Sequence, residues 1–310
     1  MGRAVAVASL ALALIPAGPA AQAPPDQSKQ IVIDVTAVDK KGAPVMDMRP
    51  GDFDVQIGHF RVPIASVTAV TPSSGDWTGR LIVLVLDDIT VAPTNISRVR
   101  DIAGRFIDDM APRDRMAVVM LDGGGGMQTT DEPAVLRGAI ERYNTHGGFT
   151  TRDGLGQEVL DTMSQIARQV MEAPGRRKII VGIGSGWVFD RPIPNPILGG
   201  GRDLRPEWTD AMRAMTYAKA NLYVIDPGGV GTAHAYSGDT GFARETGGHA
   251  FVNTNDFKGA VEKILAEAAN YYVISVPDPP TGRGADLREL EVTTRRRGVT
   301  IRARHAIPGT

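Results

Sequence analysis

The chain has 310 residues, of which 42% are hydrophobic and 22% charged, an ordinary balance for a globular protein. Its formal net charge of −1 gives no basic field that would indicate nucleic acid binding. The absence of cysteine excludes disulfides, thiolate metal sites and a cysteine nucleophile.

Residues 1–23 are typical of a secretory signal peptide. Arg3 supplies the positive charge, residues 4–15 are apolar but too short to span a bilayer, and small residues follow. A polar linker is expected at 24–29. We expect cleavage and a secreted or periplasmic protein without a later membrane span, and an uncleaved N-terminal anchor is the alternative.

Two β-rich segments flank the centre of the chain, at 30–75 and 271–307. Each is too small to bury a core alone, so we expect the two to pair into one flanking domain, a small β-sandwich. The basic run at 293–305 contains a strand in which apolar and charged residues alternate. We expect its charged face to lie in water.

The residues between the flanks, 80–270, alternate aliphatic strands with amphipathic helices. Strands are expected at 80–88, 116–121, 178–186, 220–226 and 247–253, with helices at 95–110, 131–144, 155–171, 207–220 and 256–272. The strand at 80–88 is continuously aliphatic, which is typical of a parallel strand covered on both faces. The pattern predicts an α/β fold with a doubly wound, mostly parallel sheet.

The order of four segments, LVLDDIT, GGFTT, KIIVGIGSG and ANLYVIDPGG, resembles the von Willebrand factor type A domain. The flanks resemble those of the secreted bacterial VWFA-related proteins of the Acidobacteria type, so the likeness covers about 30–307. It implies a Rossmann-like sheet of six strands, with a metal-ion-dependent adhesion site at its C-terminal edge. Ligands of open α/β sheets bind at that edge in general.

The resemblance carries a candidate metal site onto this sequence. Its residues would be Asp87, Asp88, Thr90 and Thr150. If Asp87 is the first ligand, the hydroxyl positions of the family pattern hold Ile89 and Val91, and if Asp88 is the first, they hold Thr90 and Ala92. Thr151 is the alternative to Thr150, and Ser185 stands where the pattern has an aspartate. Hard cations need several anionic oxygens, so we expect a degenerate site and no cofactor beyond weak binding of Mg²⁺ or Ca²⁺. The alternative is that the two aspartates accept hydrogen bonds from loop amides.

Other motifs argue against catalysis. The glycine loop at 122–127 lacks the Lys-Ser/Thr pair of a phosphate-binding loop, and GIGSG puts glycine where a nucleophile elbow has serine. The histidines at 146, 234 and 249 lack metal-ligand spacing. We therefore expect no enzyme and no catalytic residues. The alternative is a hydrolase that uses Asp87, Asp88 and a nearby histidine.

Three aromatic residues on or beside the long loop after strand 178–186 are candidate contacts for a partner. They are Trp187, Phe189 and Trp208. The sequence thus predicts a binding or adhesion protein that recognises a protein or a cell-surface ligand through the loops at the C-terminal edge of its sheet. A structural envelope component without a specific ligand is the remaining alternative.

Overall fold

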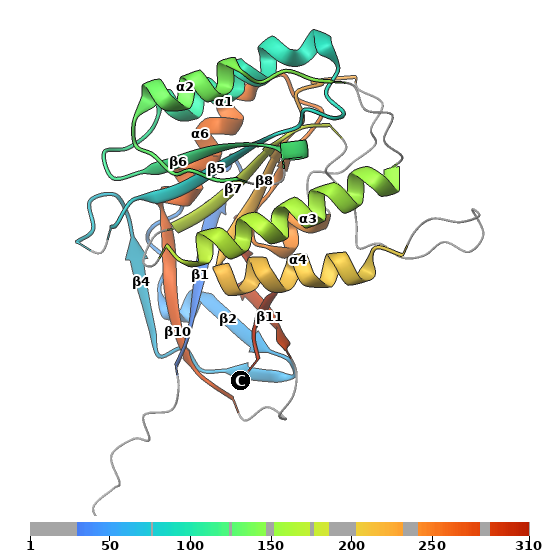
Figure 1. Cartoon of the computed structure of the whole chain (residues 1–310). Coiled ribbons are helices and arrows are strands. Elements are labelled where there is room, and N and C mark those ends of the chain that lie inside the picture. The colour runs from blue at the N-terminus through green and yellow to red at the C-terminus, as the bar shows by residue number, and fades with distance from the viewer. Residues whose placement is uncertain are drawn as a thin grey trace, which may run out of the picture.

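The structure, a computed structural model, describes residues 30–309 with internal gaps at 76, 124–125, 147–151, 174–176, 186–202, 232–240 and 280–285. The expected signal peptide and three predicted site residues, Thr150, Trp187 and Phe189, lie outside the described residues. Figure 1 shows a parallel sheet between helices in the upper part of the molecule and antiparallel strands below it.

The parallel sheet has the strand order β6-β5-β7-β8-β9. Its strands are β5 (Arg80–Leu86), β6 (Arg115–Met120), β7 (Arg177–Ile183), β8 (Ala220–Ile225) and β9 (Ala250–Phe251). Every residue of β5, β7 and β8 is buried. Continuous aliphatic sequence forms such strands because both faces of the sheet are covered. The α/β class and the mostly parallel sheet agree with the sequence prediction.

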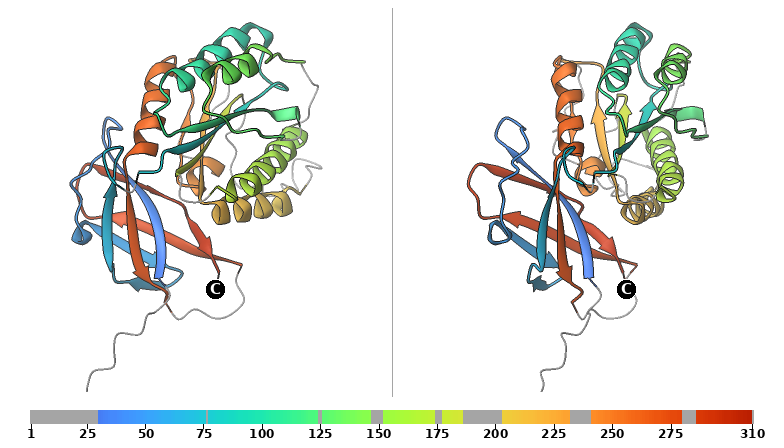
Figure 2. Two further views of the ribbon diagram at one scale, coloured as in Figure 1. Left: turned by 60° about the vertical axis from the view of Figure 1, so that its left-hand side comes forward. Right: turned by 90° about the vertical axis from the view of Figure 1, so that its left-hand side faces the viewer.

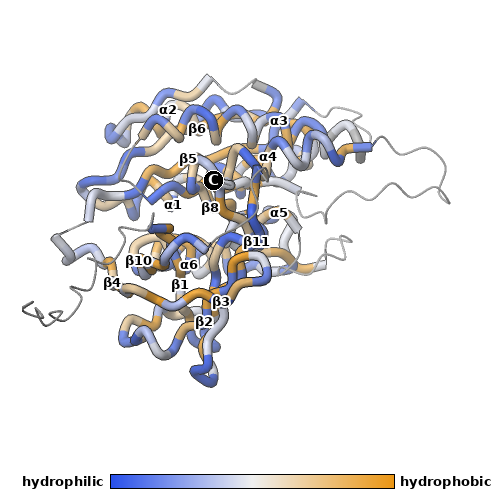
Figure 3. Tube along the Cα trace, turned by 90° about the horizontal axis from the view of Figure 1, so that it is seen from below, coloured by the Kyte–Doolittle hydropathy of each residue, from blue (hydrophilic) through white to orange (hydrophobic). Residues whose placement is uncertain are grey.

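Helices cover both faces of this sheet, as the turned views of Figure 2 show. They are α1 (Ile96–Asp108), α2 (Pro133–Glu141), α3 (Arg152–Met171), α4 (Arg205–Ala218), α5 (Gly241–Glu245) and α6 (Phe257–Ala269), with short 3-10 turns at Pro50–Asp52, Pro93–Asn95 and Leu121–Gly123. One hydrophobic cluster joins the sheet to α3, α4 and α5, and a second joins it to α1, α2 and α6. Hydrophobic and hydrophilic residues alternate along α3, as expected for a helix with one covered face (Figure 3).

The parallel sheet has five strands in the described part of the chain, where the family resemblance implied six. The segment after β6 returns antiparallel beside it but meets it only at one isolated bridge, between Met116 and Thr130. Glycine disfavours strand formation, and four glycines stand at 123–126. The expected sixth strand is thus reduced to this single bridge.

The antiparallel part consists of two four-stranded sheets, of order β12-β1-β10-β4 and β13-β11-β2-β3. The strands are β1 (Gln30–Asp39), β2 (Phe53–Ile57), β3 (Phe60–Val62), β4 (Ser66–Val70), β10 (Tyr271–Pro277), β11 (Leu287–Thr294), β12 (Val299–Ala303) and β13 (Ala306–Pro308). Each sheet takes strands from both ends of the chain, and side chains of both sheets form one buried cluster. Neither flank builds either sheet alone.

Charged side chains lie buried or half-buried where the antiparallel strands meet the parallel part. Arg177 at the start of β7 forms an ion pair of 3.0 Å with Asp34 on β1. Arg302 on β12 pairs with Glu267 on α6 at 2.7 Å, and Arg304 donates to the main-chain oxygen of Thr216 at 3.2 Å. The prediction that this face of β12 lies in water is wrong for Arg302 and Arg304, because α4 and α6 cover it.

No helix in the described portion of the chain is both long and apolar enough to cross a membrane.

Candidate functional site

Polar residues follow four neighbouring parallel strands at the points where these strands end. Asp87 follows β5, Asp122 follows β6, Ser185 follows β7 and Asp226 follows β8. Because the carboxyl ends of parallel strands meet at one edge, the four residues lie along the C-terminal edge of the sheet, where open α/β sheets bind ligands.

The buried Asp87 carboxylate is surrounded by hydrogen-bond donors. Its Oδ1 accepts from the main-chain N–H groups of Ile89 and Thr90 at 3.0 and 2.7 Å. Its Oδ2 accepts from the N–H of Ser185 at 3.3 Å, and the Thr90 hydroxyl also contacts it. A carboxylate has about four acceptor sites, so these donors occupy the whole group. Asp87 therefore ties the loop after β5 to the loop after β7.

Two residues that stand where the sequence resemblance implies hydroxyl ligands belong to the hydrophobic core. Ile89 packs into the cluster beneath α3 and α4, and Val91 into the cluster beneath α1 and α6. Both are buried. The loop is thus anchored on both faces of the sheet by apolar side chains, which offer no ligand atoms.

Tyr143, just after α2, supports the same loop. Its hydroxyl donates to the main-chain oxygen of Asp87 at 2.7 Å, and the ring is fully buried. Burial, together with the carboxylates of Asp87 and Asp88, raises the pKa of Tyr143. The hydroxyl therefore stays protonated and remains a donor at any physiological pH.

Asp226 is a site residue that the sequence prediction missed. Its Oδ1 accepts from the Ser185 hydroxyl at 3.2 Å and from the N–H of Gly228 at 2.8 Å, and the residue is buried. A carboxylate thus stands beside Ser185, contributed by the neighbouring strand. The pattern that drew attention to Asp87, an aliphatic strand running into an aspartate, also occurs in ANLYVID and could have found Asp226.

Asp88 faces a second group of titratable residues on the outer side of the edge. Its Oδ1 accepts from the N–H of Asp122 at 3.0 Å. His146 Nε2 lies 3.0 Å from Asp122 Oδ2 and 3.8 Å from Asp88 Oδ2. Burial and the carboxylates of Asp122, Asp161 and Asp88 raise the pKa of Glu158 on α3. The edge is therefore acidic, with one imidazole between two carboxylates.

Among the described residues, His146 lies beside Asp88 without a hydrogen bond to it. Its Nε2 is 3.8 Å from Asp88 Oδ2, beyond hydrogen-bond distance, and its side chain is 56% exposed. His146 pairs instead with Asp122, whose side chain is 57% exposed.

Among the described residues, no group of three or more His, Asp or Glu side chains has the arrangement needed to hold a metal ion. Of the predicted metal residues, the structure brings Asp87 and Thr90 into contact, whereas Asp88 accepts from the N–H of Asp122. Thr90 Oγ1 is also 3.0 Å from the main-chain oxygen of Ser185. Thr90 therefore serves the same loop-to-loop contact as Asp87.

Trp208 is placed differently from the sequence prediction. Its residue exposure is 6%, and its ring packs against Phe242 with centroids 5.2 Å apart. The helix α4 turns this face toward the sheet because Trp208, Ala211, Met212 and Met215 share one apolar stripe. Burial corrects the expectation that this ring is offered to a partner.

The loop after β8 presents an apolar side chain on a braced backbone. Arg98 on α1 donates to the main-chain oxygen of Pro227 at 2.6 Å, and Asn255 accepts from the N–H of Val230 at 3.2 Å. Val230 itself is 62% exposed. This loop adjoins Asp226, so the edge combines fixed backbone, acidic groups and an exposed aliphatic residue.

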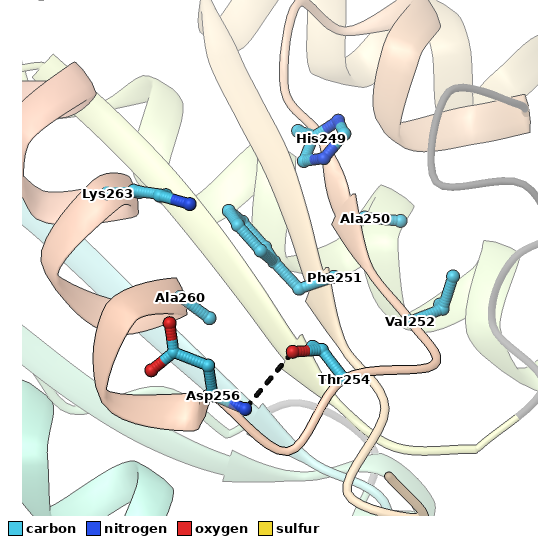
Figure 4. Close-up of a pocket in the computed structure, with 8 residues that line it drawn as sticks. All are labelled: His249, Ala250, Phe251, Val252, Thr254, Asp256, Ala260 and Lys263. Atoms are coloured by element: carbon cyan, nitrogen blue, oxygen red, sulfur yellow. Dashed lines mark hydrogen bonds between the residues drawn. The ribbon is translucent and has the colours of Figure 1, made fainter. Parts of the chain in front are cut away.

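A cavity of about 350 Å³ lies beside β9 and α6 (Figure 4). His249 and Phe251 from the β9 segment line one side, their rings 4.9 Å apart, and Lys263 of α6 lines the other. Asp256 caps α6, since its Oδ1 accepts from the N–H of Gly259 at 2.9 Å. The cavity thus brings a helix-capping carboxylate, an imidazole and an ammonium group into one lining.

No family model matches the chain, and no curated protein matches it. Among solved structures, the chain is similar to an aerotolerance-related membrane protein from Bacteroides fragilis, at 14% identity and a TM-score of 0.36 over 61% of this chain and 98% of that one. Proximal thread matrix protein 1 from the mussel byssus has 14% identity and a TM-score of 0.41 over 66% of this chain and 49% of that one.

The pilus adhesin SpaC from Lactobacillus rhamnosus GG has 9% identity and a TM-score of 0.37, over 83% of this chain and 47% of that one. At TM-scores below 0.5, none of these likenesses assigns the chain to a family or a ligand.

Proposed function

We propose that this chain is a secreted or periplasmic binding protein of the von Willebrand A-like type, which recognises a protein or surface ligand through the C-terminal edge of its parallel sheet. The observation that carries the proposal is the way Asp87 holds this edge together. Its carboxylate joins the loops after β5 and β7 through main-chain donors. Loops fixed in this way form a preorganised surface, which lowers the entropic cost of binding.

The exposed groups at this edge give it a defined chemical character. Asp122 and His146 have side chains more than half exposed, and Val230 adds an apolar contact. Such a surface suits a partner that presents basic or hydrogen-bonding groups to Asp122 and His146 and an apolar group to Val230. No enzymatic step is proposed, since the histidine and the carboxylates do not enclose a reaction site.

We infer that the metal site of the family is degenerate here. The donors around Asp87 would have to leave before a cation could be coordinated, and Ile89 and Val91 supply no oxygen. The loop is held by hydrogen bonds and core packing in the place of an ion.

We also propose that residues 30–75 and 271–307 act as one sandwich-like flanking domain, into which a domain of residues 80–270 is inserted. The shared buried cluster of the two antiparallel sheets supports this division. A fragment of residues 80–270 should fold alone, as judged by a cooperative thermal transition. Independent folding of a 30–75 fragment would contradict the division.

The binding proposal is tested with the mature chain and a panel of immobilised probes: fibrillar collagen, fibrinogen, mucin and peptidoglycan. The edge variant Asp122→Ala/His146→Ala changes only exposed side chains, so it should fold normally. The matched control, Glu141→Gln, alters the exposed end of α2. We expect saturable binding to at least one probe, reduced at least tenfold in the edge variant alone. Absence of binding, or equal binding by all three proteins, contradicts the proposal.

A further inference from the structure

A second cavity, of about 510 Å³, opens at the other end of the parallel sheet, near the start of β5 and β6. It is lined by Leu81, Arg115, Met127, Thr129, Arg168, Gln169, Glu172 and Ala173. Its volume is within the usual range of small-molecule sites. It lies at the amino ends of the strands and shares no lining residue with the Asp87 edge.

The floor of this cavity is an extension of the hydrophobic core. Leu81 is 2% exposed and belongs to the cluster beneath α3 and α4. Met127 and Ala173 are partly buried and pack against the same cluster. The floor thus offers an apolar surface that is already fixed in place before any ligand arrives.

One wall of the cavity belongs to the segment that follows β6. Among the described residues, the backbone of this segment pairs with β6 at the isolated bridge between Met116 and Thr130. Met127 and Thr129, just before that bridge, line the cavity together with Arg168 and Gln169 from the last turn of α3.

Two arginines, Arg115 and Arg168, line the cavity. Arg115 donates from Nη2 to the main-chain oxygen of Thr129 at 2.8 Å, which fixes its side chain but uses only one of its five donors. Neither Arg115 nor Arg168 forms an ion pair with a carboxylate in the described part of the chain. Glu172 is the one acidic residue in the lining, so the two arginines leave the cavity with an excess positive charge.

We propose that this cavity binds a small organic anion with an apolar tail, namely a carboxylate whose hydrocarbon part lies on Leu81, Met127 and Ala173 and whose charge is held by Arg115 and Arg168. Guanidinium forks bind carboxylates with two parallel hydrogen bonds, which gives direction as well as charge. The apolar floor adds the hydrophobic contribution of each buried methylene. The site is independent of the proposed binding edge.

Hexanoate serves as the probe, and hexan-1-ol, which has the same chain without the charge, serves as its control. Binding to the full mature chain is followed through the methyl resonance of ¹³C-labelled Met127. We expect a saturable shift with hexanoate and at least a tenfold weaker effect with hexan-1-ol. Equal responses to both compounds would mean that the arginines do not select an anion, and would overturn the proposal.

Three variants separate anion binding from a merely structural role. Arg168→Gln and Arg115→Gln should each weaken hexanoate binding at least fivefold. Arg105→Gln is the matched control, because Arg105 is also an exposed arginine in the last turn of a helix and does not line this cavity. Thermal unfolding checks that each variant folds. Unchanged affinity in the folded Arg168→Gln variant would overturn the proposal.

Discussion

Arg302 on β12 and Glu267 on α6 form an ion pair of 2.7 Å that joins the antiparallel strands to the last helix of the parallel part. The Glu267 side chain is only 1% exposed, and Tyr223 on β8 donates to its second oxygen at 3.3 Å. Burial is the main reason that the pKa of Glu267 is raised, and Arg302 opposes this shift. The pair is therefore what allows an ionised carboxylate to lie inside the junction.

Replacing Arg302 should expose this dependence. The Arg302→Leu variant leaves a buried carboxylate without its cation, and we expect a loss of about 3–5 kcal/mol in the free energy of unfolding. Urea unfolding measures it. The control is Arg295→Leu, which removes an exposed ion pair with Asp54 and should cost less than about 1 kcal/mol. Similar losses in both variants would show that the buried ion pair contributes no more to stability than the exposed one.

We expect the Asp87 carboxylate to contribute to the stability of the fold, whether or not a ligand binds. Asp87→Ala leaves three main-chain N–H groups without their acceptor, two of them in the loop after β5 and one on Ser185. We expect a loss of about 3 kcal/mol or more, since each buried unsatisfied donor costs about 1–3 kcal/mol. Chemical unfolding tests this, with the exposed Asp122→Ala variant as control. A loss below about 1 kcal/mol would contradict the structural role of Asp87.

Divalent cations should have little effect on this protein. Because donors already occupy Asp87, millimolar Mg²⁺, Ca²⁺ or Mn²⁺ should shift the melting temperature by less than about 1 °C, whereas a tightly bound ion would raise it. Calorimetric titration gives the second readout, with little or no heat expected. Micromolar binding that disappears in Asp87→Ala would overturn this prediction and restore a functional metal site.

Trp208 should behave as a core residue. Trp208→Ala removes a buried ring that packs on Phe242, and we expect a loss of about 3–5 kcal/mol. Tyr217 stands on the same helix with 43% exposure, so Tyr217→Ala should cost less than about 1 kcal/mol. Thermal or urea unfolding compares the two. A Trp208→Ala variant that keeps its stability but binds the probes differently would show that Trp208 is a contact residue.

The acidic edge should show a small dependence of stability on pH. The pKa of Glu158 is raised in the folded state, so its ionised form is disfavoured there relative to the unfolded chain. Ionised Glu158 therefore lowers stability above its folded pKa, and this penalty vanishes below about pH 4, where both states are protonated.

Glu158→Gln should accordingly raise the melting temperature at pH 7–8 by about 1–2 °C, a small gain because the group is partly exposed. The gain should disappear below about pH 4. The exposed Glu141→Gln variant is the control and should show no change at either pH. A gain that persists at low pH would assign the effect to something other than charge.

The sequence predicts the helices and parallel strands well because their signals are local. Continuous aliphatic runs such as 81–86 form buried strands wherever both faces are covered, and helical spacing marks α1 and α6. The missing sixth strand was expected from family resemblance rather than from residues. The glycines at 123–126 argued locally against it.

The site was less predictable, because its contacts join distant segments. Nothing in LVLDDIT indicates that Ser185, 98 positions later, donates to Asp87, or that Tyr143 supports the same residue. Alternation along 299–304 correctly gave two faces, but it could not reveal that α4 and α6 cover the charged one. The alternation in the sequence indicates that one face of the strand is polar. It does not indicate whether that face contacts water or another element of the fold.

The pairing of Val70 with Tyr271 also bears on how the chain is made. Strands β1 to β4 leave the ribosome about 200 residues before their partners β10 to β12, while the parallel part is complete by Ala269. During synthesis the edges of the early strands therefore stay unpaired until their partner strands are made, and unpaired edges are prone to aggregation. A chain built in this way is exposed to aggregation until its last strands have been synthesised.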